Sequence, residues 1–117
     1  MAELTTHVLD TARGRPAAGV PIRLYECRGD ERTLIKTTET NAGGRTSGPL
    51  LAGQALRVGV YELVFGAGQY FRTQGETLAD PPFLGEVVIR FGVADPSAHY
   101  HVPLLLSPYG YSTYRGS

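Results

Sequence analysis

The sequence predicts an all-β protein, and three observations lead to this fold class. Several short runs alternate apolar and polar residues, which is typical of strands with one buried face. Glycine and proline contribute 15 and 8 of the 117 residues and fall between these runs, where they favour turns. Only one short segment is a candidate helix. Many short strands at regular spacing indicate a sandwich or a barrel.

The pattern predicts eight strands and one helix. Six strands follow from the alternation alone, at residues 4–10, 21–27, 33–39, 58–65, 86–93 and 99–107. Two shorter strands, near Arg45 and at residues 111–114, are expected because turn sequences flank them. The helix is expected at residues 69–74, because this segment contains no proline and is followed by Gly75, a residue that favours helix ends.

The length and charge of the chain limit the classes of protein it can belong to. With 117 residues, we expect a single domain over residues 1–117. Eleven Lys and Arg residues balance eleven Asp and Glu residues, so neither nucleic acid nor an anionic membrane is an expected partner. No segment approaches the run of about 20 apolar residues that spans a bilayer.

The cellular location is expected to be the cytoplasm. Cys27 is the only cysteine, which excludes an internal disulfide and a multi-cysteine metal site and favours a reducing compartment. The first residues lack the basic and then apolar pattern of a signal peptide, and the final Gly-Ser is not a peroxisomal address.

Two strands place histidines among apolar residues on what should be their outer face. In residues 99–107 the core side is Tyr100, Val102, Leu104 and Leu106, which leaves the opposite face to His99, His101, Pro103 and Leu105. In residues 4–10 the outer face is Thr5, His7 and Leu9. An exposed face should be polar, so we expect this one to form a cleft covered by another subunit, in a homo-oligomer.

Histidine titrates near neutral pH, so each of the three histidines is a candidate for proton transfer. Taken singly, His7 and His101 could also be ordinary hydrogen-bonded strand residues. His99 and His101 share a face and would form a metal pair if His7 supplied a third ligand. No HExxH pattern and no second cysteine accompanies them, so no metal is predicted.

Two further segments are candidates for a functional site. The residues Gly43-Gly44-Arg45 lack the spaced glycines and the lysine of a phosphate-binding loop, and are interpreted as a tight turn that presents Arg45. The last residues combine aromatic rings, a guanidinium group and hydroxyls, and alternation places Ser112, Tyr114 and Gly116 on one face. The alternative is an edge strand with a frayed end.

Four motifs together resemble the transthyretin-like family of 5-hydroxyisourate hydrolases. They are Leu4-Thr-Thr-His7-Val-Leu-Asp10, Gly44-Arg45-Thr46, Tyr100-His101-Val102-Pro103 and the terminal Tyr114-Arg115-Gly116-Ser117. The terminal motif distinguishes the hydrolases from transthyretin, the hormone carrier. The resemblance runs nearly end to end and implies a sandwich of two four-stranded sheets with one short helix, assembled as a homotetramer with sites between dimers.

The resemblance also implies a set of site residues. The catalytic residues would be His7, Arg45, His101 and Ser117, and the substrate-binding residues would be His7, Arg45, Tyr114, Arg115 and Gly116. No cofactor and no metal are implied, and His99 lies outside the set.

The implied reaction is the hydrolysis of 5-hydroxyisourate to 5-hydroxy-2-oxo-4-ureido-2,5-dihydro-1H-imidazole-5-carboxylate in urate degradation. Such a reaction needs a base for water, a group that stabilises an oxyanion and groups that hold a flat heterocycle. We assign water activation to His101, with or without His7, which leaves open which histidine is the base, and charge stabilisation to Arg45. Two alternatives are a non-enzymatic small-molecule carrier of the transthyretin type and a metallohydrolase.

Overall fold

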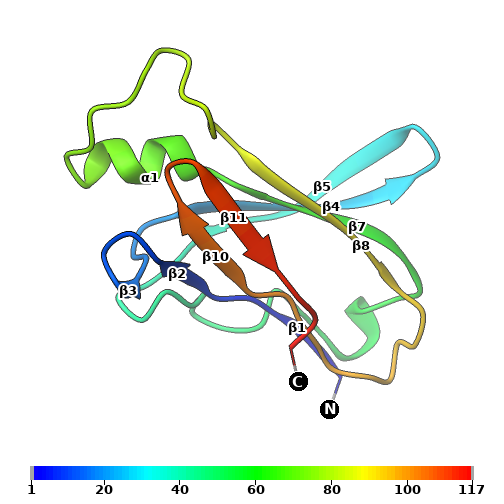
Figure 1. Ribbon diagram of the computed structural model, residues 1–117. Coiled ribbons are helices and arrows are strands. Elements are labelled where there is room, and N and C mark those ends of the chain that lie inside the picture. Colours follow the sequence, from blue (N-terminus) through cyan, green and yellow to red (C-terminus); the bar gives the residue numbers. More distant parts are fainter. Residues whose placement is uncertain (1, 117) are drawn as a thin grey trace.

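The computed structural model describes residues 2–116 and confirms an all-β protein with one α-helix (Figure 1). The elements follow one another as β1 (Glu3–Thr5), β2 (Val8–Asp10), β3 (Arg15–Pro16), β4 (Pro21–Arg28), β5 (Glu31–Glu39), β6 (Leu51–Ala52), a 3-10 turn (Gly53–Ala55), β7 (Gly59–Phe65), α1 (Ala67–Thr73), β8 (Val87–Val93), β9 (Tyr100–His101), β10 (Leu104–Ser107) and β11 (Gly110–Thr113).

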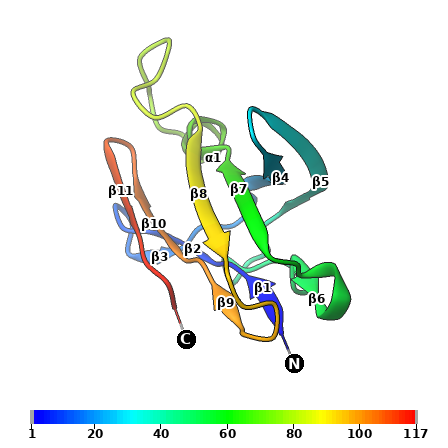
Figure 2. The same ribbon diagram turned by 90° about the vertical axis from the view of Figure 1, so that its right-hand side faces the viewer.

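The strands form two layers around one apolar core. One layer is an antiparallel sheet with the order β5-β4-β7-β8, and the other contains the sheets β6-β1-β9 and β11-β10-β2-β3 (Figure 2). The core side chains come from both layers, as alternation requires, and the core includes Leu4, Val8, Leu24, Leu63 and Leu104, each fully buried.

The expected pair of four-stranded sheets is wrong in one respect, because the second layer is divided in two. The expected strands 4–10 and 99–107 are each interrupted, at residues 6–7 and 102–103, giving β1 and β2, and β9 and β10. Pro103 lies in this gap and has no N–H to donate, but the Val102 and Leu104 N–H groups on either side of it still bond to the carbonyls of Thr5 and His7. The register nevertheless continues: Thr5 pairs with His101 before the gap and Val8 pairs with Leu104 after it.

Other boundaries also differ from the expectation, and three of these differences concern Arg45, the last strand and the helix. No strand forms at Arg45, which makes a single bridge to His7, and the short strand lies at β6 instead. The last strand, β11, ends at Thr113, one residue before Tyr114. The helix begins two residues and ends one residue earlier than expected, at Ala67 and Thr73, and Gly75 after it has a φ of +89°, which suits a residue without a side chain.

A buried hydrogen bond connects α1 to β2. The Tyr70 hydroxyl donates to the Asp10 carboxylate at 2.7 Å, and Arg13 pairs with the same carboxylate at 3.3 Å. Burial and the neighbouring carboxylate raise the pKa of Tyr70 to about 12, so this tyrosine keeps its proton and stays a donor. The Asp10 carboxylate therefore has hydrogen-bond partners although it is fully buried.

Within residues 2–116, no helix has the length and apolar character needed to cross a membrane.

Candidate active site

The interrupted parallel ladder brings two histidines into contact. His101 ends β9, and His7 lies in the gap between β1 and β2, where its carbonyl accepts a hydrogen bond from the Leu104 N–H at 2.9 Å. Nδ1 of His7 and Nε2 of His101 are hydrogen-bonded at 2.8 Å, and the ring centroids are 4.9 Å apart. Because both backbones are held by the ladder, the pair is positioned by the sheet and not by a flexible loop.

Thr5 completes the contacts of His101. Its Oγ1 lies 2.7 Å from Nδ1 of His101, so both ring nitrogens of that histidine have partners. The side chain of His101 is almost wholly buried. His7 is half-buried, and among residues 2–116 nothing forms a hydrogen bond with its Nε2. His7 is therefore the member of the pair with a ring nitrogen free for another molecule.

A tight turn presents Arg45 beside His7, as the sequence predicts. The Asn41 side chain accepts hydrogen bonds from the N–H groups of Gly43 and Arg45, and Arg45 forms a backbone bridge with His7. Gly44 has a φ of +75° and lies so close to β2 that a Cβ there would be 2.5 Å from the Val8 carbonyl oxygen. Only glycine fits at this position, and it allows the turn to bring the Arg45 guanidinium group to the histidines.

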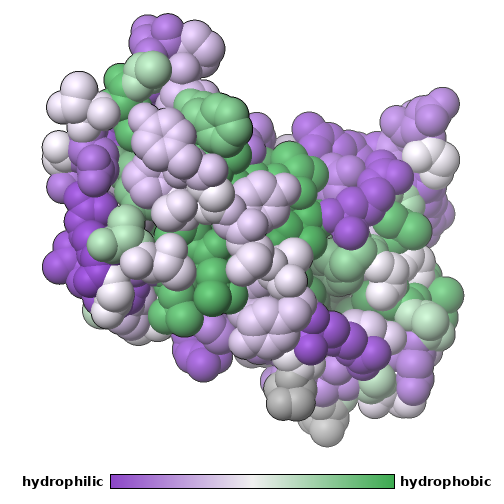
Figure 3. Space-filling model, viewed as in Figure 1, coloured by the Kyte–Doolittle hydropathy of each residue, from purple (hydrophilic) through white to green (hydrophobic). Residues whose placement is uncertain are grey.

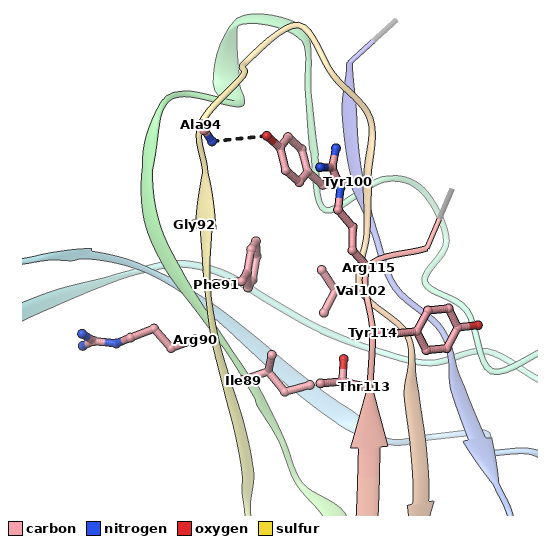
Figure 4. A pocket seen from close by; sticks show the side chains of 10 residues that line it. All are labelled: Ile89, Arg90, Phe91, Gly92, Ala94, Tyr100, Val102, Thr113, Tyr114 and Arg115. Carbon is pink, nitrogen blue, oxygen red and sulfur yellow. Dashed lines mark hydrogen bonds between the residues drawn. The ribbon is translucent and has the colours of Figure 1, made fainter.

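The end of the chain closes another side of the site. The Gly116 N–H donates to the His101 carbonyl at 2.7 Å, and a Cβ on Gly116 would be 2.7 Å from Cδ2 of the His101 ring. Tyr114 precedes Gly116 by two residues, so it lies on the same face, and its largely exposed ring points away from the interior of the sandwich (Figure 4). Alternation thus places Tyr114 and Gly116 as predicted.

Arg115 points to the opposite side of the chain. Its guanidinium group lies 4.2 Å from the centre of the Tyr100 ring and donates to the His99 carbonyl at 3.3 Å. Figure 4 shows it reaching towards Tyr100 in a separate, mainly apolar cavity of about 370 Å³ between β8 and β11. The predicted substrate-binding role of Arg115 therefore has no support from its position in this chain.

The side chains converge on an open cleft of about 460 Å³. Among residues 2–116, its lining residues carry imidazole, guanidinium, hydroxyl and phenol groups and no side-chain carboxylate; they are Thr5, His7, Arg45, His99, His101, Tyr114 and Gly116. Among residues 2–116, no group of three His, Cys, Asp or Glu side chains is arranged to hold a metal ion. The cleft therefore presents donors and positive charge to whatever enters it.

Burial keeps both histidines neutral. Desolvation and the nearby charge of Arg45 lower the pKa of His7 below its ordinary value of about 6.5. The pKa of His101 is lowered first by desolvation and then by His7, Arg45 and His99. At pH 7 both rings are uncharged, which is the state that a general base requires.

The cleft gathers most of the predicted site residues and adds two. His7, Arg45, His101, Tyr114 and Gly116 meet there, whereas Arg115 does not. Ser112 is not among the lining residues, and Ser117 lies outside the described residues. The additions are Thr5 and His99.

A signal for Thr5 and His99 was present in the sequence. Alternation places Thr5 on the outer face with His7, and His99 on the outer face with His101. His99 is exposed, as expected, yet its Nε2 lies 3.4 Å from Oγ1 of Thr5 at the edge of the cleft.

Comparison with known proteins identifies the relatives of this chain. The HIUase/Transthyretin family model matches residues 4–116. The chain is 64% identical over 114 residues to "5-hydroxyisourate hydrolase 2" of Rhizobium meliloti, covering 97% of this chain and 95% of that protein.

Two solved structures have the same fold. The 5-hydroxyisourate hydrolase of Klebsiella pneumoniae matches with a TM-score of 0.80, 35% identity and complete coverage of both chains. Sea bream transthyretin in complex with thyroxine matches with a TM-score of 0.85 and 32% identity over 98% of this chain and 95% of that chain.

The lowered pKa values lead to a titration test. In an NMR titration of the folded protein, His7 and His101 should protonate below about pH 6.5, the ordinary midpoint. Arg45→Gln should raise the midpoint of His7, because it removes a charge that repels the imidazolium. Arg28→Gln, on an exposed arginine of β4, is the matched control. A His7 midpoint above 6.5, or one unaffected by Arg45→Gln, contradicts the electrostatic account.

The same shifts predict the pH dependence of stability. A folded-state pKa below the unfolded value means that the unfolded chain binds protons first as the pH falls. The two histidines make their full contribution to the free energy of unfolding above about pH 6.5, and this contribution decreases as the pH falls to their folded pKa values. The free energy of unfolding, followed by urea denaturation, should therefore fall with pH in this range, and less so in His7→Gln.

Proposed function

The chain belongs to the HIUase/Transthyretin family, and on this premise we propose that it is an enzyme that hydrolyses 5-hydroxyisourate. The observation that carries the proposal is the hydrogen-bonded pair of neutral histidines beside Arg45 in an open cleft. A carrier of the transthyretin type has the same fold, so the fold does not discriminate. A reactive polar cleft favours catalysis over storage of an apolar ligand.

The proposed reaction opens the six-membered ring of the substrate at an acyl–nitrogen bond. Water loses a proton to a base, and its oxygen adds to the acyl carbon. The resulting oxyanion collapses, the carbon–nitrogen bond breaks, and the leaving nitrogen takes up the proton held by the base. The product is the ureido-imidazoline carboxylate, and the chemistry needs no electron acceptor and no metal.

We assign the role of base to His7. Both ring nitrogens of His101 already have partners in Thr5 and His7. Within residues 2–116 no group bonds to Nε2 of His7, so this nitrogen can accept a proton from water. His101 then orients His7 and shares the charge that His7 acquires. The sequence left this choice open, and the hydrogen bonds within the chain support His7.

The remaining lining residues take the supporting roles. Arg45 is exposed in the cleft and carries a planar, permanently charged fork suited to a developing oxyanion or to the carbonyls of the ring. Tyr114 contributes an aromatic ring and a phenol next to the same space. Gly116 acts by packing against His101. A catalytic role for Ser117 remains part of the proposal as a prediction.

We propose a homotetramer in which another subunit covers the cleft. Leu9 and Leu105 are half-buried on the outer face of the sheet that carries the histidines, and hydrophobic patches lie among polar ones on the face with β10 and β11 (Figure 3). Pro103, also expected there, is buried within the chain itself. Covering this face would remove water from the cleft and strengthen the electrostatic interactions between its charged and polar groups and the substrate.

The cytoplasm stays the predicted location, compatible with the free thiol of Cys27.

Turnover is tested by generating 5-hydroxyisourate with urate oxidase and following its ultraviolet decay. The decay should exceed the spontaneous rate after chelator treatment and dialysis. His7→Gln and Arg45→Gln should each lower kcat/KM by about 100-fold, the usual cost of losing a base or an oxyanion partner. Arg28→Gln serves as the control and should behave as wild type. Decay at the spontaneous rate with ample protein would contradict the hydrolase and favour the carrier. Activity that is lost on chelation and restored by zinc would favour a metallohydrolase.

The contact between Gly116 and His101 predicts the effect of one methyl group. Gly116→Ala places a Cβ inside the His101 ring contact, so the ring or the chain end must shift, and turnover should fall by about tenfold to a hundredfold. Gly110→Ala on β11 is the matched control, since its Cβ would find its nearest neighbour at an ordinary 3.7 Å. Equal activity of the two variants would remove Gly116 from the site.

The assembly is checked by light scattering on the protein at micromolar concentration. The mass should be four times the 12.6 kDa of one chain. Leu105→Glu should shift the distribution to smaller species, because it places a charge on the face to be covered. A monomeric wild type would contradict the tetramer.

A further inference from the structure

We propose that Thr5 is a positioning residue of the reaction, whose hydroxyl holds the two histidines in the tautomers that leave Nε2 of His7 unprotonated. The inference rests on the proposed hydrolysis and names a residue outside the implied site set. Thr5 does not need to touch the substrate. It acts through His101, which in turn acts on His7.

The geometry of Thr5 is determined by the ladder. Thr5 pairs with His101 in the parallel register of β1 and β9, and its carbonyl accepts from the Val102 N–H at 2.9 Å. Threonine is β-branched, so its side chain has few rotamers on a strand. Its Oγ1 lies 2.7 Å from Nδ1 of His101, a short hydrogen bond for a neutral pair. The hydroxyl is thus a fixed partner of this ring.

The three hydrogen-bonded groups allow two arrangements of protons. In the first, His7 donates from Nδ1 to Nε2 of His101, and His101 donates from Nδ1 to the Thr5 oxygen. In the second, the Thr5 hydroxyl donates to Nδ1 of His101, and His101 donates from Nε2 to Nδ1 of His7. Only the first leaves a lone pair on Nε2 of His7, because a neutral imidazole carries one proton. The second places a proton there, and His7 could not accept one from water.

The surroundings of Thr5 favour the first arrangement. Nε2 of His99 lies 3.4 Å from Oγ1 of Thr5, on the solvent side, and offers an acceptor for the hydroxyl proton. With its proton directed to His99 or to water, the Thr5 oxygen presents a lone pair to His101.

Replacing the hydroxyl by a methyl group should reverse the preference. In Thr5→Val the β-branched shape is kept, but Nδ1 of His101 loses its acceptor, and an N–H aimed at a methyl group is unsatisfied. His101 would then carry its proton on Nε2 and donate to Nδ1 of His7, which leaves His7 with its proton on Nε2. Thr5→Ser retains the hydroxyl and is the matched control.

The first readout is independent of activity. The carbon and nitrogen chemical shifts of the imidazole rings distinguish the two tautomers in the labelled, substrate-free protein at a pH where both rings are neutral. Wild type and Thr5→Ser should show His7 protonated on Nδ1, and Thr5→Val should show a shift towards Nε2. His7 protonated on Nε2 in the wild type would overturn the proposal at once, whether or not Thr5→Val folds.

The second readout is turnover of 5-hydroxyisourate. Thr5→Val should lose about tenfold to a hundredfold in kcat, the usual cost of removing a group that orients a reacting residue, with a much smaller change in KM. Thr5→Ser should recover most of the activity. Unchanged kcat in Thr5→Val would overturn the role. If the wild type does not turn over the substrate, the proposed function fails, and the tautomer measurement still decides the role of Thr5.

Discussion

The site depends on one parallel strand pair that is interrupted and then resumes in the same register. Thr5 pairs with His101 on one side of the gap and Val8 pairs with Leu104 on the other, with Pro103 in between. A proline cannot donate to the ladder, yet the Val102 and Leu104 N–H groups on either side of it still bond to the opposite strand. Because the register survives, His7 and His101 lie next to each other across the gap.

Burial in the sheet layer also determines the protonation state of these histidines. A strand embedded in a packed layer buries much of each ring, which disfavours the imidazolium and lowers both pKa values. The nitrogens of a buried ring also need hydrogen-bond partners, and Thr5 and His7 are these partners for His101. The same burial that stabilises the layer therefore keeps both imidazoles uncharged, which is the form that the proposed base requires.

The fold itself does not distinguish an enzyme from a small-molecule carrier. Sea bream transthyretin in complex with thyroxine has the same architecture at 32% identity, and the 5-hydroxyisourate hydrolase of Klebsiella pneumoniae has it at 35%. What distinguishes this chain is a small set of side chains on one outer face, from β1 and the gap after it, the turn at Arg45, the segment of β9 and the last described residues. Residues far apart in sequence meet there because the first and last strands belong to the same layer (Figure 1).

From the sequence, alternation and turn chemistry predicted most of the strands and their faces, because these are local properties, and the resemblance to the 5-hydroxyisourate hydrolases implied the site residues. Thus Leu4 and Leu104 are core residues, and His7, Arg45 and His101 share one cleft with Tyr114 and Gly116, as predicted. Only the tertiary structure decided the split of the second sheet, the turn of Arg115 towards Tyr100 and the place of Thr5 beside His101. The split and the place of Thr5 depend on the register between strands 96 residues apart, which no local pattern predicts. The direction of Arg115 depends on how the last residues pack against Tyr100.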